Sequence, residues 1–139
     1  MPDLVIDGQT VNQDSKAYII VDIGHNHQGD LELAKEMVLA AKQSGGDAMK
    51  FQTRHPRDVY SVAEYNRVSD NPNWFGRTYG EHREHLELAD DEWQDLFEFC
   101  NEVEVTGFST PFDFKSVDLL EKLNVPAYKV ASGDATNIP

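Results

Sequence analysis

Two lysines of this chain stand in short apolar runs that are typical of buried strands. Lys50 lies within the run 47–52, and Lys129 lies within a similar run near the carboxyl end of the chain. An ammonium group there costs several kcal/mol to desolvate unless an anion pairs with it. Two interpretations follow: internal neutralisation by Asp22 and Asp134, or a binding site for an anionic ligand.

Polar side chains follow the other apolar runs at equivalent points. Such runs are followed by Asp22, by the pair Ser109-Thr110 and by Ser132. Together with the two lysines, the hydroxyl groups and the backbone N–H groups of Ser132 and Gly133 would suit a carboxylate and a phosphate. Asp22 and Gln52 carry no positive charge and would suit the hydroxyl groups or the aldehyde of a sugar. The pattern therefore indicates a site for an anion beside a sugar.

A parallel α/β sheet would bring these side chains to one edge. Strands are predicted near residues 18–22, 47–51, 105–109 and 127–131. Helical patterns separate them, and the carboxyl ends of parallel strands meet at one rim. An Asp7-Gly8 pair between two β-prone runs predicts a hairpin over residues 4–12 ahead of the first of these strands.

The connections between the strands differ greatly in length. Asp30 is a plausible N-cap for a helix that ends at Gly45, and further helices are predicted over about 90–103 and 115–123. The segment 53–88 is much longer than a usual connection and is rich in aromatic residues. We expect part of this segment to fold over the rim.

Two histidine patterns invite a metal interpretation. His25 and His27 stand at alternate positions of a polar loop, but no third ligand lies nearby in the sequence. The favoured interpretation is hydrogen bonding at the rim, to the substrate or to the neighbouring strand end, and Asn26 and His27 are the expected substrate-binding residues of this loop. In the run 81–85 the histidines are three residues apart, where a zinc helix has four, so a solvated charged face is expected.

Composition limits the classes of function. Twelve basic and 25 acidic side chains give a net charge of -13, which argues against nucleic acid or an anionic membrane as a partner. An anionic substrate would need local cations, for which Lys50, Arg54 and Lys129 are the candidates. The single cysteine, Cys100, fits a core thiol. The chain has no long apolar run and its first residues do not resemble a signal peptide, so a cytoplasmic location is expected.

Four ordered motifs resemble the amino-terminal half of the sialic acid synthases. They occupy residues 20–30, 47–52, 109–113 and 128–134, and the resemblance extends from residue 17 to the end of the chain. It implies a (β/α)8 TIM-type barrel, of which this chain supplies about the first four βα units after the hairpin. It also implies a transferase that condenses phosphoenolpyruvate with N-acetylmannosamine or a related aldose and releases phosphate.

The resemblance also implies roles for individual residues. The phosphoenolpyruvate would be held by Lys50, Thr110, Lys129 and Ser132. Asp22 and Gln52 would face the sugar, and Asp22, Lys50 and Lys129 are the expected catalytic residues. A divalent metal, usually manganese, would be held by histidines from the later half of the barrel, which is not in this chain.

Two positions depart from the family pattern, which has glutamate at Asp22 and usually at Asp134. The shorter side chain at Asp22 retracts the carboxylate by about 1 Å, a displacement that can cost on the order of 100-fold in rate unless backbone or substrate moves to meet it. The sugar is therefore expected to differ.

Four βα units leave a barrel open, with unpaired strand edges at both sides. We expect the chain to form a homo-oligomer or to pair with a second half. The small antifreeze-like carboxyl-terminal domain of the family is also absent from this chain. Two other hypotheses remain: a non-catalytic half-barrel that serves as an assembly module, and a synthase of the deoxy-octulosonate type. The latter would take phosphorylated aldoses and would need more basic residues than this half provides.

Overall fold

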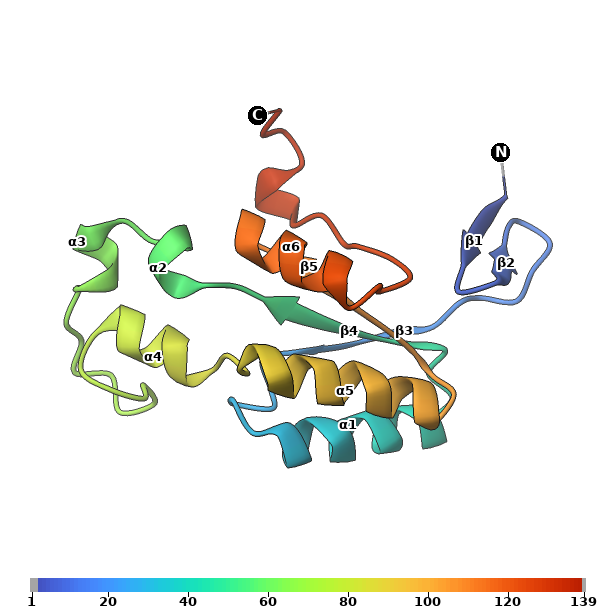
Figure 1. The fold of residues 1–139 in the computed structure, drawn as a ribbon, viewed down its shortest axis with the longest axis horizontal. Coiled ribbons are helices and arrows are strands. Elements are labelled where there is room, and N and C mark those ends of the chain that lie inside the picture. Colours follow the sequence, from blue (N-terminus) through green and yellow to red (C-terminus); the bar gives the residue numbers. More distant parts are fainter. Residues whose placement is uncertain (1–2, 139) are drawn as a thin grey trace.

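The computed structural model describes residues 3–138 and is an α/β fold built on a parallel sheet (Figure 1). The strands are β1 Leu4–Ile6, β2 Gln9–Val11, β3 Ile20–Gly24, β4 Ala48–Thr53 and β5 Thr106–Pro111. The helices are α1 Leu31–Gln43, α2 Pro56–Val59, α3 Val62–Tyr65, α4 Tyr79–His85, α5 Asp90–Glu102 and α6 Phe114–Lys122, followed by the short 3-10 turn η1 Ser132–Asp134. None of the helices between residues 3 and 138 is long and apolar enough to cross a membrane.

The hairpin of β1 and β2 lies where the Asp-Gly pair predicted it. Its strands are antiparallel, with Ile6 opposite Gln9, and both turn residues have positive φ angles, 49° at Asp7 and 76° at Gly8. Such a turn matches the twist of the flanking strands. The Thr106 hydroxyl donates to Asp7 Oδ2 at 2.9 Å, which ties the hairpin to the amino-terminal end of β5.

The main sheet has the order β3-β4-β5, and all its strands are parallel. Asp22 pairs in register with Lys50, and Gln52 pairs with Thr110. Since side chains alternate between the two faces of a strand, these four residues lie on the face opposite Phe51. We call this face the inner face, because the helices pack on the other side.

The prediction of a fourth parallel strand was wrong. Near residues 127–131 the structure has a single parallel bridge between Tyr128 and Ser109 in place of a strand. The Lys129 N–H donates to the Ser109 carbonyl at 3.1 Å. Among the described residues, the backbone pairing of this segment with β5 consists of this bridge and this hydrogen bond, which is too little to define a strand.

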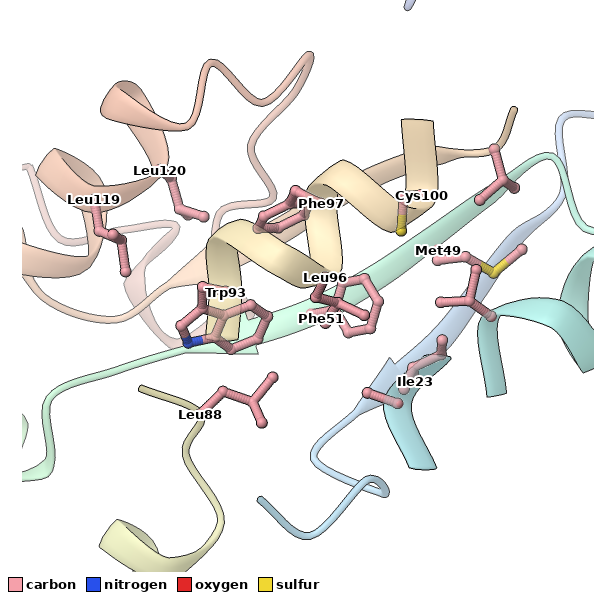
Figure 2. Packing of buried hydrophobic residues seen from close by; sticks show 13 residues of the cluster. Ile23, Met49, Phe51, Leu88, Trp93, Leu96, Phe97, Cys100, Leu119 and Leu120 are labelled. Carbon is pink, nitrogen blue, oxygen red and sulfur yellow. The ribbon is translucent and has the colours of Figure 1, made fainter. Parts of the chain in front are cut away.

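The core lies between the sheet and helices α1, α5 and α6 (Figure 2). Phe51 is fully buried between two aromatic residues of α5, with ring centroids 5.8 Å from Trp93 and 6.0 Å from Phe97. Burying a side chain of this size contributes about 1.5–3 kcal/mol. Helix α1 begins at its predicted cap, where Asp30 Oδ1 accepts from the Leu33 N–H at 3.0 Å. The position of β4, and with it the inner face, is therefore set by the core.

The long segment between β4 and α5 has structure of its own, formed by α2, α3 and α4. Thr78 and Glu81 form a capping box at the start of α4. His82 stacks on Trp74 with a centroid distance of 5.4 Å, and His85 stacks on Phe75 at 4.1 Å. The solvated charged face expected for residues 81–85 is thus only partly present, because both imidazoles pack on aromatic rings.

Candidate functional site

Lys50 and Asp22 form an ion pair at the centre of the inner face. Lys50 Nζ lies 2.7 Å from Asp22 Oδ1. The two side chains differ in burial, with 8% of Lys50 exposed and 65% of Asp22. The internal partner that the sequence left open for Lys50 is therefore present. The exposed Asp22 carboxylate still has its second oxygen available to a ligand.

Gln52 and Thr110 extend this row toward the carboxyl ends of the strands. They are register partners on β4 and β5. Thr110 is 1% exposed, and its Oγ1 has no hydrogen-bond partner among the described residues. A buried hydroxyl without a partner is costly, so a ligand atom or a further part of the protein would stabilise it.

Lys129 and Ser132 are exposed. Tyr128 points toward the helix side, where its hydroxyl donates to Glu121 of α6 at 2.6 Å. Alternation along an extended segment then assigns Lys129 to the inner face, the face of Lys50. Within residues 3–138, no carboxylate forms an ion pair with Lys129, so its predicted neutralisation by Asp134 is not observed.

The loop after β3 places Asn26 and His27 differently from each other. Asn26 is exposed, and its side-chain amide donates to the Ile23 carbonyl at 2.8 Å. His27 is fully buried, lies edge-on to Trp93 at 6.1 Å and accepts from the Gly29 N–H. His27 therefore packs behind the rim, on the core side, whereas the sequence placed it at the substrate.

Gly24, the last residue of β3, lies close to two of the polar side chains of the inner face. Its φ angle is +56°, and a Cβ atom there would lie 3.3 Å from Asp22 Oδ1 and 3.7 Å from Gln52 Nε2. A side chain at this position would occupy the space between the two polar groups. The glycine keeps this part of the rim open to a ligand.

A buried cluster of His25, Arg54, Arg83 and Glu87 adjoins this rim. Glu87 Oε1 lies 2.9 Å from His25 Nε2 and 3.2 Å from Arg54 Nε. The Arg54 guanidinium also donates to Gln52 Oε1 and lies over the Phe112 ring, with a distance of 4.1 Å to its centroid. Arg54 thus links the cluster to Gln52, the glutamine that is expected to face the sugar.

The cluster keeps His25 neutral. Guanidinium nitrogens of Arg54 and Arg83 lie 3.5 and 3.3 Å from His25 Nδ1, and since arginine only donates, Nδ1 is the accepting nitrogen. The hydrogen is therefore on Nε2, which faces Glu87. Burial, together with the charges of Arg54, Arg83 and Lys50, lowers the pKa of His25 to about 3. Burial raises the pKa of Glu87 to about 8, although Arg54 opposes this shift.

Sequence reasoning named Arg54 as a cation but missed Arg83 and Glu87. Arg83 lies in the run 81–85, for which a solvated charged face is expected, and Glu87 follows it within the long segment 53–88. No local pattern joins them, because Arg83 lies on α4 and Glu87 lies beyond its end at His85.

One further group of potential metal ligands, His55, Asp58 and Asp113, lies at the carboxyl end of β4. Asp113 already accepts from the His55 N–H at 2.7 Å and caps α6 through the Ser116 N–H at 2.8 Å. Asp58 pairs with Lys115 at 2.7 Å. Burial tends to raise the pKa of Asp113, but these hydrogen bonds outweigh it and hold the pKa below its ordinary value. Because the ligand atoms are occupied, we derive no metal chemistry from this group.

Cys100 is buried in the core, as its sequence context predicted. Burial raises the pKa of its thiol to about 12. A thiol with such a pKa is a poor nucleophile.

Comparison with known proteins places this arrangement in a family. The profile of the NeuB family matches residues 37–139. The chain belongs to the NeuB family. The resemblance to sialic acid synthases that the motifs indicated is thereby confirmed.

Relatives of this NeuB chain include proteins named as synthases of N-acetylneuraminate 9-phosphate and of N,N'-diacetyllegionaminic acid. It is 38% identical over 132 residues to N-acetylneuraminate-9-phosphate synthase from Homo sapiens, covering 95% of this chain and 37% of the relative. It is 41% identical over 123 residues to N,N'-diacetyllegionaminic acid synthase from Legionella pneumophila, covering 88% of this chain and 35% of the relative. The NeuB chain thus spans about a third of the length of these relatives.

Solved structures agree on the fold. The N-acetylneuraminic acid synthetase from Leptospira borgpetersenii superposes with a TM-score of 0.79 at 24% identity, covering 99% of this chain and 44% of that one. A spore coat polysaccharide biosynthesis protein from Bacillus subtilis superposes with a TM-score of 0.68 at 29% identity, covering 94% and 34%. The NeuB chain therefore shares an α/β fold with a parallel sheet with these proteins.

Proposed function

We propose that this protein contributes the phosphoenolpyruvate and sugar sites of a synthase that condenses phosphoenolpyruvate with an aldose and releases phosphate. The observation that carries the proposal is the inner-face row of Asp22, Lys50, Gln52 and Thr110 at the carboxyl ends of parallel strands in a NeuB-family chain. Active sites of (β/α)8 barrels lie at this end of the strands. The proposed architecture is the corresponding part of such a barrel.

Lys50 is the proposed anchor for the enol phosphate. Its ammonium is buried and has one exposed carboxylate as partner, so a bound anion would share its charge. The unpartnered Thr110 hydroxyl and the exposed Lys129 and Ser132 complete the proposed phosphoenolpyruvate site. In a site with little water, such charge matching is worth several kcal/mol.

The proposed reaction forms one C–C bond. C3 of phosphoenolpyruvate attacks the aldehyde carbon, and the carbonyl oxygen takes up a proton to become a hydroxyl group. Water adds to C2, and the C2–O bond to phosphate then breaks, which leaves a 2-keto acid and inorganic phosphate. Asp22 and Gln52, beside the glycine gap, are the proposed ligands of the sugar.

The shorter acid at Asp22 is compatible with a sugar other than N-acetylmannosamine. In this structure the Asp22 carboxylate contacts Lys50, so it does not extend freely toward a substrate. The relatives act on different sugars by name, and the human relative forms a 9-phosphate whereas the Legionella relative does not. Because the phosphate of phosphoenolpyruvate is released, a phosphorylated product requires a phosphorylated aldose.

The rest of the barrel, a divalent metal such as Mn2+ and an oligomeric assembly belong to the same proposal. Within residues 3–138, the three-stranded sheet leaves the outer edge of β3 unpaired, where further strands would add. The metal would supply polarisation of the aldehyde carbonyl. Its ligands are expected outside this chain.

The test is phosphate release from phosphoenolpyruvate by the purified protein, with and without N-acetylmannosamine, and with Mn2+ or a chelator. Aldose-dependent release that is lost in Lys50→Ala and kept in Lys122→Ala supports the proposal, because Lys122 is an exposed lysine of α6. No release with any aldose tested would favour the alternative, a non-catalytic half-barrel. The mass in solution then tells whether the protein assembles.

A further inference from the structure

Positive charge gathers at one point of an acidic protein. Arg54 and Arg83 both approach His25 Nδ1, at 3.5 and 3.3 Å, and Lys50 is close enough to lower the pKa of the same imidazole. The chain as a whole has a net charge of -13. Like charges brought together destabilise the fold unless an anion neutralises them.

The counter-charges near His25 do not balance these cations. Lys50 pairs with Asp22, and Arg54 pairs with Glu87. In the part of the chain from residue 3 to residue 138, no carboxylate forms an ion pair with Arg83, and its buried Nε has no hydrogen-bond partner. The Arg83 guanidinium is thus a partly buried cation that has no carboxylate partner in this range and whose Nε donor is unsatisfied.

Glu87 compensates the arginines only weakly near neutral pH. Its side chain is 9% exposed, and burial raises its pKa to about 8. A carboxyl group with this pKa is largely protonated at pH 7. Neither Arg54 nor Arg83 then has a fully ionised Glu87 carboxylate to balance its charge.

The cluster lies on the sugar side of the proposed site. His25 follows β3 at one edge of the sheet. The proposed phosphoenolpyruvate residues Thr110 and Lys129 lie on and beyond β5 at the opposite edge, and the anchor Lys50 lies between the two edges on β4. Arg54 donates to Gln52 Oε1, and Gln52 Nε2 lies toward the gap at Gly24. An anion at the arginines would therefore be carried by the molecule that contacts Gln52.

We propose that Arg83, with Arg54 beside it, forms a subsite for a phosphate monoester on the aldose. This inference rests on the proposed condensation and narrows its substrate to a phosphorylated sugar. The planar guanidinium groups would donate to the phosphate oxygens, and Gln52 would hold the adjoining sugar. The basic residues that a phosphorylated aldose requires thus come from α4 and the end of β4.

Isothermal titration calorimetry of the protein with N-acetylmannosamine 6-phosphate and with N-acetylmannosamine tests the subsite. We expect the phosphorylated sugar to bind more tightly, and Arg83→Gln to reduce that preference by about 10- to 100-fold. The matched control is Arg77→Gln, which removes an exposed arginine of the same segment. This control is expected to keep the preference.

Three results would overturn the subsite: equal affinity for the two sugars, no binding of either, or a preference that survives Arg83→Gln. Loss of phosphoenolpyruvate binding in Arg83→Gln with sugar binding unchanged would also overturn it, because the arginine would then serve the other substrate. If Arg83→Gln does not fold, Arg83→Lys serves as the second variant. It keeps the positive charge but loses the paired donors of the planar guanidinium, so we expect it to lose part of the preference for the phosphorylated sugar.

Phosphate release, measured in parallel, separates this inference from the proposed function. Release with N-acetylmannosamine and no preference for its 6-phosphate would refute the subsite and leave the condensation standing. Arg83-dependent binding of the 6-phosphate without any release would support the subsite and refute the condensation.

Discussion

Replacing Glu87 with glutamine should change how the stability of this protein depends on pH. The Glu87 side chain is 9% exposed and contacts His25 Nε2 at 2.9 Å and Arg54 Nε at 3.2 Å. Burial raises its pKa from 4.5 to about 8. The folded state therefore holds a proton that the unfolded chain releases between these two values.

The sign follows from linkage. Where the folded state binds the extra proton, the free energy of unfolding falls as pH rises, at about 1.4 kcal/mol per pH unit at most. His25 acts in the opposite direction: burial lowers its pKa from 6.5 to about 3, so stability falls as pH drops below 6.5. Between pH 6.5 and 8 Glu87 is the larger contributor of this pair, because the unfolded-state imidazole is already half neutral at pH 6.5. We expect Glu87 to account for a loss of roughly 1.5 kcal/mol over this range.

Urea unfolding at half-unit steps from pH 6.5 to 8 measures this slope. Glu87→Gln should remove most of it, because the neutral amide has no proton to release. Glu98→Gln, on the exposed face of α5, is the control and should keep the slope of the wild type. If Glu87→Gln and wild type lose stability equally over this range, the assignment of a raised pKa to Glu87 is refuted.

Three further substitutions test the site and its supports. Lys50→Ala should raise the KM for phosphoenolpyruvate and lower kcat, measured by phosphate release; unchanged kinetics would remove Lys50 from the site. Gly80→Ala would place a Cβ 2.4 Å from the Tyr65 ring and should cost about 1–3 kcal/mol in thermal unfolding, whereas an unchanged Tm would show that the ring can move aside. Asp113→Ala removes the cap of α6 and should cost about 0.5–2 kcal/mol in urea unfolding, and a smaller loss would mean that the Ser116 N–H finds another acceptor.

Local chemistry made much of this fold predictable. The Asp7-Gly8 turn, the Asp30 cap and the buried run containing Phe51 each depend on neighbouring residues or on a short repeat. The same holds for the row of polar groups, because parallel strands place their carboxyl ends together. The pairing of Lys50 with Asp22 followed as one of two stated alternatives.

The errors have a common origin in contacts between distant segments. The strand expected near residue 128 is a single bridge, since pairing depends on which neighbours are present. His27 was placed at the substrate because its loop is polar, but Trp93 of α5 packs against it on the core side. Neither contact can be predicted from the residues that are neighbours along the chain.

The amino-acid order thus dictated where strands, caps and turns form and which polar groups reach the rim, since those depend on spacing along one strand or helix turn. The joining of His25, Arg54, Arg83 and Glu87 arose from folding of the segment 53–88 back onto the loop after β3. Burial in that contact shifts the pKa values of His25 and Glu87 and leaves Arg83 without a carboxylate partner within residues 3–138. Charge and desolvation depend on distances in space, which the spacing along a chain does not specify.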